Sequence, residues 1–198
     1  MQQGTSTSEL HEKARTLWFQ VGDVDPESEQ YETADHRRAS GAEANRAVGY
    51  RRSASWADAL HRYEEFWRAS EHTPRENTRN RSTLPNNERR LGEWARHQRR
   101  FDDRLTAYQR IRLDVSPAFE WDPHESRWRI NLAASIQHVQ TNGRLPRLTS
   151  ADPAEFALGR WLGRQLRQLK SGTLSRDREA HISALLALPT GVPEKPTL

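Results

Sequence analysis

Hydrophobic and polar positions follow a helical period through most of residues 53–188. In the first such stretch, apolar residues recur every three to four positions at Trp56, Leu60, Tyr63 and Trp67. That spacing places the four side chains on one face of an α-helix. No stretch rich in β-branched residues shows the strict alternation of a half-buried strand. The pattern therefore predicts an all-α fold.

The helical stretches form two groups of three, over residues 53–122 and 123–188. Residues with short polar side chains stand before most of the stretches, where they can cap a helix by accepting a hydrogen bond from its first free N–H groups. The expected N-caps are Ser53 or Ser55, Asn86 or Asn87, Thr106, Asp152 and Ser175. We therefore expect two three-helix units in tandem.

Residues 1–52 lack the regular helical pattern of the two units. One short piece, residues 10–19, is amphipathic and is a candidate for a short helix, and the polar segment that follows it has almost no aliphatic residues. Such a segment cannot bury enough apolar surface to offset the entropy of ordering, so we expect a linker or disorder there. The Pro-rich residues 189–198 are expected to form a disordered tail.

The two groups share a sequence repeat. The motif LGxWxxxQ at residues 91–98 recurs at 158–165, and Trp56-x3-Leu60 recurs as Trp128-x3-Leu132. Such a repeat predicts two copies of one structural unit. The residues expected in the repeated core are Trp56, Leu91, Gly92, Trp94, Gln98, Trp128, Leu158, Gly159, Trp161 and Gln165.

Some of these residues invite a functional interpretation, but a structural one is favoured. Tryptophans at helical spacing beside leucines belong in a core rather than on a base-stacking surface. We expect Gln98 and Gln165 to bond buried backbone rather than read adenine. Gly92 and Gly159 cost about 1 kcal/mol each relative to alanine inside a helix. Their recurrence predicts a close helix–helix approach beneath the tryptophans.

These motifs together resemble the helicase-associated domain, a trihelical module found in tandem in some bacterial helicases and in proteins without a helicase motor. The resemblance covers residues 56–121 and 128–188. The family pattern LGxWxxxQR is complete at residues 91–99, whereas the second copy has Leu166 in place of the arginine. The resemblance implies a helical nucleic-acid-binding module without catalytic machinery. No GxxxxGK[ST] phosphate loop of a motor occurs in the chain.

Charge divides the chain further. Its net charge of +4 is the sum of two unlike parts. Residues 1–50 have nine acidic and five basic groups, whereas residues 51–198 have 26 basic and 18 acidic groups. A basic body suits a polyanionic partner. The chain has no cysteine, which excludes a disulfide scaffold and a thiolate zinc site. It also shows no secretory signal and no apolar run of membrane-spanning length, so we expect a cytoplasmic, nucleoid-associated protein without membrane contact.

Arginines make up 28 of the 31 basic residues, and they cluster on the second helix of each unit. Guanidinium groups stay charged and bind phosphate bidentately, so a row of them suits nucleic acid. The alternative interpretation is an ordinary solvated helix face. The candidate nucleic-acid-binding residues are Arg89, Arg90, Arg96, Arg99, Arg100, Arg104, Arg160, Arg164, Arg167 and Lys170. Only Arg100 and Arg167 occupy equivalent positions in the two copies.

Enzymatic chemistry finds little support in the sequence. His97 with Asp102 and Asp103 has the residue types of a metal site, but not the spacing of a known ligand motif. Glu64 and Glu65 are interpreted as a solvated pair. We therefore expect no enzyme, no cofactor and no metal.

The leading hypothesis is a non-catalytic accessory or regulatory protein that binds nucleic acid, with double-stranded DNA favoured over RNA. The alternative is a protein-interaction module that docks a polymerase, a helicase or another replication or transcription factor, and that is encoded by a phage or mobile element. In either case the acidic residues 1–50 could shield the basic body.

Overall fold

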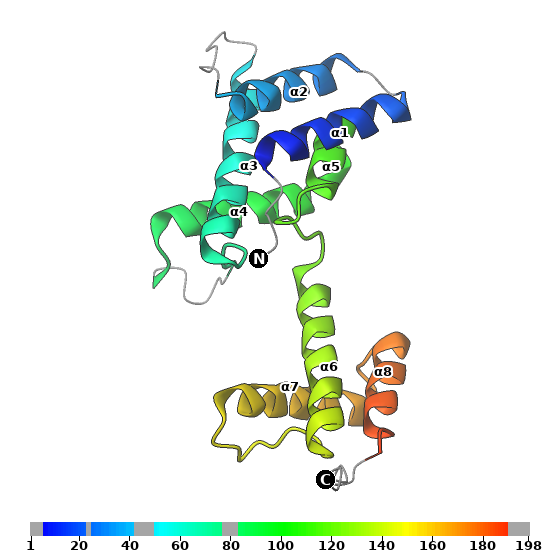
Figure 1. The fold of residues 1–198 in the computed structure, drawn as a ribbon. Coiled ribbons are helices and arrows are strands. Elements are labelled where there is room, and N and C mark those ends of the chain that lie inside the picture. Colours follow the sequence, from blue (N-terminus) through cyan, green and yellow to red (C-terminus); the bar gives the residue numbers. More distant parts are fainter. Residues whose placement is uncertain (1–5, 23–24, 42–49, 77–82, 190–198) are drawn as a thin grey trace, which may run out of the picture. The chain divides into compact units, whose positions relative to one another are not determined.

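A computed structural model describes residues 6–22, 25–41, 50–76 and 83–189, and the regular structure within these ranges is entirely helical. The all-α prediction is therefore confirmed. The chain divides into two compact units, residues 1–121 and 122–198, which are coloured blue to green and green to red in Figure 1. Within the described ranges, no helix combines the length and the apolar content needed to span a membrane.

Among its described residues, unit 1 contains one helix more than the sequence pattern predicts, over residues 26–39, and its first helix covers the amphipathic residues 10–19. Its helices are α1 (Thr7–Val21), α2 (Pro26–Ala39), α3 (Arg51–Ser70), α4 (Asn86–Arg100) and α5 (Ala107–Asp114), with a 3-10 turn at Asp102–Arg104. Helix α1 packs on α5 and α2, and α2 also packs along α3 (Figure 1). Helices α3, α4 and α5 lie within the range of the first expected group of three, but they share one core cluster with α1 and α2.

The second half of the leader, where a linker is expected, contains a folded helix. Asp25 caps α2 by accepting a hydrogen bond from the Ser28 N–H, and Pro26 occupies its first turn. The buried Tyr31 ring meets Trp56 edge-on, with 5.5 Å between ring centroids. The inward face of α2 carries Ser28 and Asp35 in addition to Tyr31, so it lacks the apolar periodicity that reveals most buried helices. The disorder expected for residues 42–49 and 190–198 lies outside the described residues.

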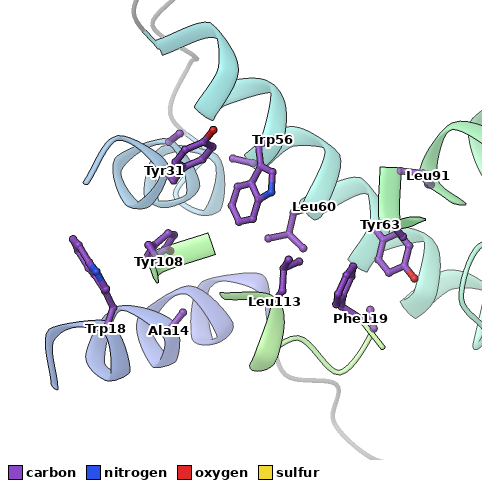
Figure 2. Packing of buried hydrophobic residues seen from close by; sticks show 14 residues of the cluster. Ala14, Trp18, Tyr31, Trp56, Leu60, Tyr63, Leu91, Tyr108, Leu113 and Phe119 are labelled. Atoms are coloured by element: carbon purple, nitrogen blue, oxygen red, sulfur yellow. The ribbon is translucent and has the colours of Figure 1, made fainter. Parts of the chain in front are cut away.

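Aromatic side chains dominate the core of unit 1. Figure 2 shows Trp18 and Tyr108 at one end of the cluster and Tyr63 at the other, with Leu60 and Leu113 between them. Trp18 meets Tyr108 edge-on at 5.6 Å between centroids. Each large aromatic side chain buries about 150–250 Å². A chain with only 34% hydrophobic residues can therefore still form this core.

Unit 2 consists of α6 (Pro123–Asn142), α7 (Pro153–Lys170) and α8 (Arg176–Leu186). Its smaller core is built on buried tryptophan and aliphatic side chains, namely Trp128, Leu132, Val139, Trp161, Leu162, Ile182 and Leu185. Helix α6 ends at Gly143, whose φ of 63° is the left-handed conformation that glycine adopts without strain.

The predicted helix caps are confirmed in part. Thr106, Asp152 and Ser175 each accept a hydrogen bond from the first turn of the following helix. The predictions for α3 and α4 are wrong, because each helix begins one or more residues earlier than expected. Helix α3 begins at Arg51 and α4 at Asn86, and the residues before them make no capping bond through a side chain. Within α3, the Ser53 hydroxyl instead donates to the Tyr50 carbonyl.

The two units share a buried hydrogen bond between repeated residues. In unit 1 the Trp56 Nε1–H donates to Gln98 Oε1 at 3.1 Å, and in unit 2 Trp128 Nε1–H donates to Gln165 Oε1 at 2.9 Å. The expectation that the glutamines bond backbone holds for Gln98, whose Nε2 donates to the Trp94 carbonyl at 3.4 Å, but both side-chain oxygens accept from an indole. Each bond joins the first and second helices of a repeat, so both motifs of the sequence repeat meet in one contact.

Each repeated glycine packs against the backbone of a loop rather than against a neighbouring helix. A Cβ atom on Gly92 would lie 2.8 Å from the Arg75 carbonyl oxygen, and one on Gly159 would lie 2.8 Å from the Arg147 carbonyl oxygen. Both neighbours are backbone of the loop that precedes the second helix. The predicted close approach therefore exists, but the predicted partner, another helix, is wrong.

A glutamate fixes the same loop in both units. Glu88 Oε1 accepts the Arg75 backbone N–H at 3.0 Å, and Glu155 Oε1 accepts the Arg147 backbone N–H at 2.9 Å. Hydrogen bonds from the Arg75 side chain lower the pKa of Glu88, and those from Arg144 lower the pKa of Glu155. The two units thus share a tryptophan–glutamine bond, a glycine beneath a loop and a glutamate that holds that loop.

Candidate nucleic-acid interface

The clearest basic surface of the described residues is the outward face of α7. It carries Arg160, Arg164, Arg167 and Lys170, all of them exposed. The opposite face of the helix is fixed in the core by buried residues that include Trp161 and Gln165. Because the core contacts fix the rotation of α7, the basic row faces solvent. These four residues form the α7 basic row.

The α7 basic row has no internal acidic partner. No carboxylate within residues 6–22, 25–41, 50–76 and 83–189 pairs with any of its four members. Phe156 lies one turn before the row and is 40% exposed, and the Arg160 guanidinium lies 5.9 Å from the centre of its ring. Unpaired cations on one helix face keep their full charge available for an external anion.

Two of the candidate nucleic-acid-binding arginines on α4 bond to other groups of the protein. Arg96 Nη2 donates to the Glu76 carbonyl at 2.5 Å, and Arg99 pairs with the Glu76 carboxylate. Arg99 also donates to the Glu120 carbonyl at 3.0 Å, and its guanidinium lies over the Phe119 ring. Only 12% of the Arg99 side chain is exposed. These two residues therefore connect α4 to the loop before it, at Glu76, and Arg99 also connects it to the segment after α5, at Glu120.

The other predicted residues of unit 1 remain accessible. Arg90 is exposed, and Arg89 donates to the Asn86 side chain at 2.8 Å. Arg100 and Arg104 are both exposed, and their guanidinium groups lie 5.3 and 4.9 Å from the centre of the Phe101 ring. Unit 1 therefore offers a second basic patch, at the end of α4, with an aromatic ring at its centre.

The two basic surfaces are not copies of one another. Arg100 and Arg167 stand at equivalent positions and are both exposed. At the positions equivalent to Arg160 and Arg164, however, α4 carries Glu93 and His97. The repeated skeleton thus supports a longer and more uniformly basic row in unit 2 than in unit 1.

Unit 1 also contains a buried network of charged groups that the sequence pattern did not indicate. Arg112, on α5, donates to Asp35 at 2.8 Å and to both carboxylate oxygens of Glu64 at 2.7 and 3.1 Å. His61 and Tyr108 contact Asp35 at 2.5 and 2.7 Å. The expectation of a solvated Glu64–Glu65 pair is therefore wrong for Glu64. Its side chain is 1% exposed, and it accepts hydrogen bonds from Arg112 on α5 and from the Ser116 hydroxyl that follows this helix.

The network is fully satisfied. Among the described residues, no buried side-chain nitrogen or oxygen lacks a hydrogen-bond partner. Burial by itself raises the pKa of Asp35, but the hydrogen bond with His61 and the charge of Arg112 outweigh that effect and hold the pKa at about 2. Burial and the neighbouring Asp35 charge raise the pKa of Tyr108. The network joins α2, α3 and α5, so its evident role is to hold unit 1 together.

Comparison with known proteins adds no relative to this picture. No family model, no curated protein and no solved structure matches the chain. The functional interpretation therefore depends on the surface geometry and on the motif resemblance of residues 91–99 and 158–165.

Proposed function

We propose that this chain is a non-catalytic nucleic-acid-binding protein that contacts phosphates through the α7 basic row and acts as an accessory or regulatory factor. The observation that carries the proposal is the row of four exposed cations on one helix face, none of which has a carboxylate partner among the described residues. Double-stranded DNA is the preferred ligand, because the motif resemblance is to a module of bacterial helicases.

The dimensions of the row suit a phosphate backbone. A helix rises about 1.5 Å per residue, so Arg160 and Lys170 lie about 15 Å apart along the axis of α7. Duplex DNA carries one charge per about 3.4 Å of axis on each strand, so the row can follow several phosphates. Arginine is well suited to such contacts, because its planar guanidinium can bind a phosphate through two parallel hydrogen bonds.

The accessible arginines of unit 1 provide a second contact of the same kind. Arg90, Arg100 and Arg104 are exposed, and the Phe101 ring lies beneath two of them. Arg96 and Arg99 are left out of this proposal, because Glu76 and backbone carbonyls occupy their guanidinium groups.

The test measures binding to a fluorescently labelled DNA duplex as a function of salt concentration. Each phosphate neutralised on a duplex contributes about −0.9 to the slope of log affinity against log salt, so loss of three contacts should reduce the slope by about 2.7. The variant is the triple substitution of Arg160, Arg164 and Arg167 by alanine. Single-stranded DNA and RNA of matched length identify the preferred ligand.

The matched control removes the same charge from arginines that already have acidic partners. Arg62, Arg110 and Arg129 are exposed and pair with Asp58, Asp102 and Glu125 respectively. Their triple substitution by alanine should leave the salt slope within one unit of the wild type. An equal loss of slope in both variants would show that net charge, rather than the α7 basic row, governs binding.

A wild-type chain without salt-dependent binding to any of the three nucleic acids would refute the proposal. In that event the same surface would remain suited to an acidic protein. A stoichiometric partner captured from nuclease-treated lysate, and lost with the α7 triple variant, would replace nucleic acid as the ligand.

A further inference from the structure

The contact between α1 and α2 brings together three side chains that commonly bind transition metals. His11 and Glu12 lie on α1 and His36 lies on α2, and one donor atom from each lies within 4.8 Å of the other two. The two imidazole rings are 5.1 Å apart between centroids. We propose that these three residues form a binding site for a divalent transition-metal ion of the zinc or nickel type.

His11 is held in an orientation that suits this role. Its side chain is 1% exposed, and its Nε2 atom lies 3.3 Å from Glu32 Oε1. When Nε2–H donates to that carboxylate, the lone pair belongs to Nδ1, which lies 3.5 Å from Glu12 Oε1. Histidines that bind metals typically donate their second ring N–H to a carboxylate in this way, which fixes the tautomer and strengthens the ligand.

The donor set selects the class of metal. Two imidazoles and one carboxylate suit zinc, nickel or copper, whereas magnesium and calcium prefer sets of oxygen ligands. In a tetrahedral site with bonds of 2.0–2.1 Å, ligand atoms lie about 3.3 Å apart, so the present cluster must contract on binding. Glu12 and His36 are exposed and can contract by rotating their side chains.

Arg15 is the cation that faces this cluster. Its Nε atom lies 3.4 Å from Glu32 Oε1, and its Nη1 atom lies 3.9 Å from Glu12 Oε2. The contact with Glu32 is the shorter one, so Arg15 can keep it when Glu12 turns to a metal. Three protein ligands leave the fourth position of a tetrahedral ion for water.

The experiment measures binding of Zn²⁺ to the EDTA-treated full chain by titration calorimetry, and follows Co²⁺ by its d–d absorption. We expect one equivalent to bind, and we expect His36→Gln and Glu12→Gln each to weaken binding at least tenfold. Both residues are exposed, so the folded state should tolerate these changes. The control is His124→Gln, which replaces an exposed histidine on α6 in unit 2.

A second measurement locates the ion. Hydrogen exchange of peptides from α1 and α2 should slow when Zn²⁺ is added, because the ion joins the two helices, and peptides from α6 to α8 should not change. The proposal is overturned if the wild type binds no stoichiometric metal, if His36→Gln binds as tightly as the wild type, or if His124→Gln weakens binding equally.

Discussion

Arg112→Met should destabilise unit 1 more than any surface substitution of the same kind. Arg112 is fully buried, and its guanidinium supplies hydrogen bonds to both Asp35 and Glu64. Methionine replaces the aliphatic part of the arginine side chain but offers neither charge nor N–H donors. The substitution therefore leaves two carboxylates in the protein interior without their shared cation.

The expected loss is large relative to the stability of a domain. Removing one partner of a buried ion pair costs about 3–5 kcal/mol, because the remaining charge is left desolvated and uncompensated. Domains of this size are stable by only about 5–15 kcal/mol. At about 3 kcal/mol or more, the melting temperature of unit 1 should fall by at least about 10 °C.

The assay must separate the two units, because tryptophans occur in both of them. Hydrogen exchange followed by mass spectrometry reports on each helix, so protection should fall in α2, α3 and α5 and stay unchanged in α6, α7 and α8. The control is Arg110→Met on the same helix, where the side chain is about half exposed. If the free energies of unfolding of the two variants agree within about 0.5 kcal/mol, the reasoning is refuted, since surface changes typically fall within that range.

Two further predictions concern acid stability and the loop beneath α7. The pKa of Asp35 is about 2 in the folded chain against an ordinary value of 3.8, so Asp35 contributes about 2 kcal/mol that is fully present above about pH 4 and lost as the pH falls toward 2. In urea titrations over this window Asp35→Asn should lose less stability than the wild type, and parallel losses would contradict the assignment. Gly159→Ala should cost about 1–3 kcal/mol, since the new Cβ would meet the Arg147 backbone at 2.8 Å. A Cβ atom at Gly163 would meet only Leu148 Cδ1, at 3.9 Å, so Gly163→Ala should instead gain up to about 1 kcal/mol of stability from helix propensity. If the melting temperatures of both variants shift in the same direction, the close approach at Gly159 is contradicted.

The sequence predicts the helices whose buried faces are apolar. Trp128, Leu132 and Val139 on α6 follow a helical period, and all three are buried. Asp152 and Ser175 cap the helices that follow them, because capping depends on residues close in sequence. The two copies of the LGxWxxxQ motif also indicate residues with the same contacts. The local hydrophobic pattern and the internal repeat therefore predict most of the helices.

What the sequence does not reveal is the set of contacts between distant polar residues. Asp35 and Arg112 are 77 positions apart, and each looks like an ordinary surface residue until the helices are packed. The inward face of α2 is polar for this reason, so hydropathy alone predicts a linker there. Glu76 likewise lies far from Arg96 and Arg99 in sequence, and only the structure shows that it occupies both of them. Because these ion pairs join residues far apart in sequence, the sequence pattern does not predict α2. It also does not distinguish the arginines that are bonded within the fold from those that are free to bind a ligand.

The repeat helps to explain how one basic helix can be available while the other is partly occupied. Both second helices are fixed by the same contacts, namely an indole–glutamine bond and a glutamate that holds the preceding loop. These contacts use only the inward face and the first turn, so they leave the outward face free to differ. In unit 1, Arg96 and Arg99 on α4 serve the packing of neighbouring segments, and Glu93 stands where unit 2 has Arg160. In unit 2 the outward face of α7 makes no such pairs with the part of the chain that the structure describes. If both units contact one nucleic acid, α7 should therefore contribute the larger share of the salt dependence, and α4 should contribute mainly through Arg90 and Arg100.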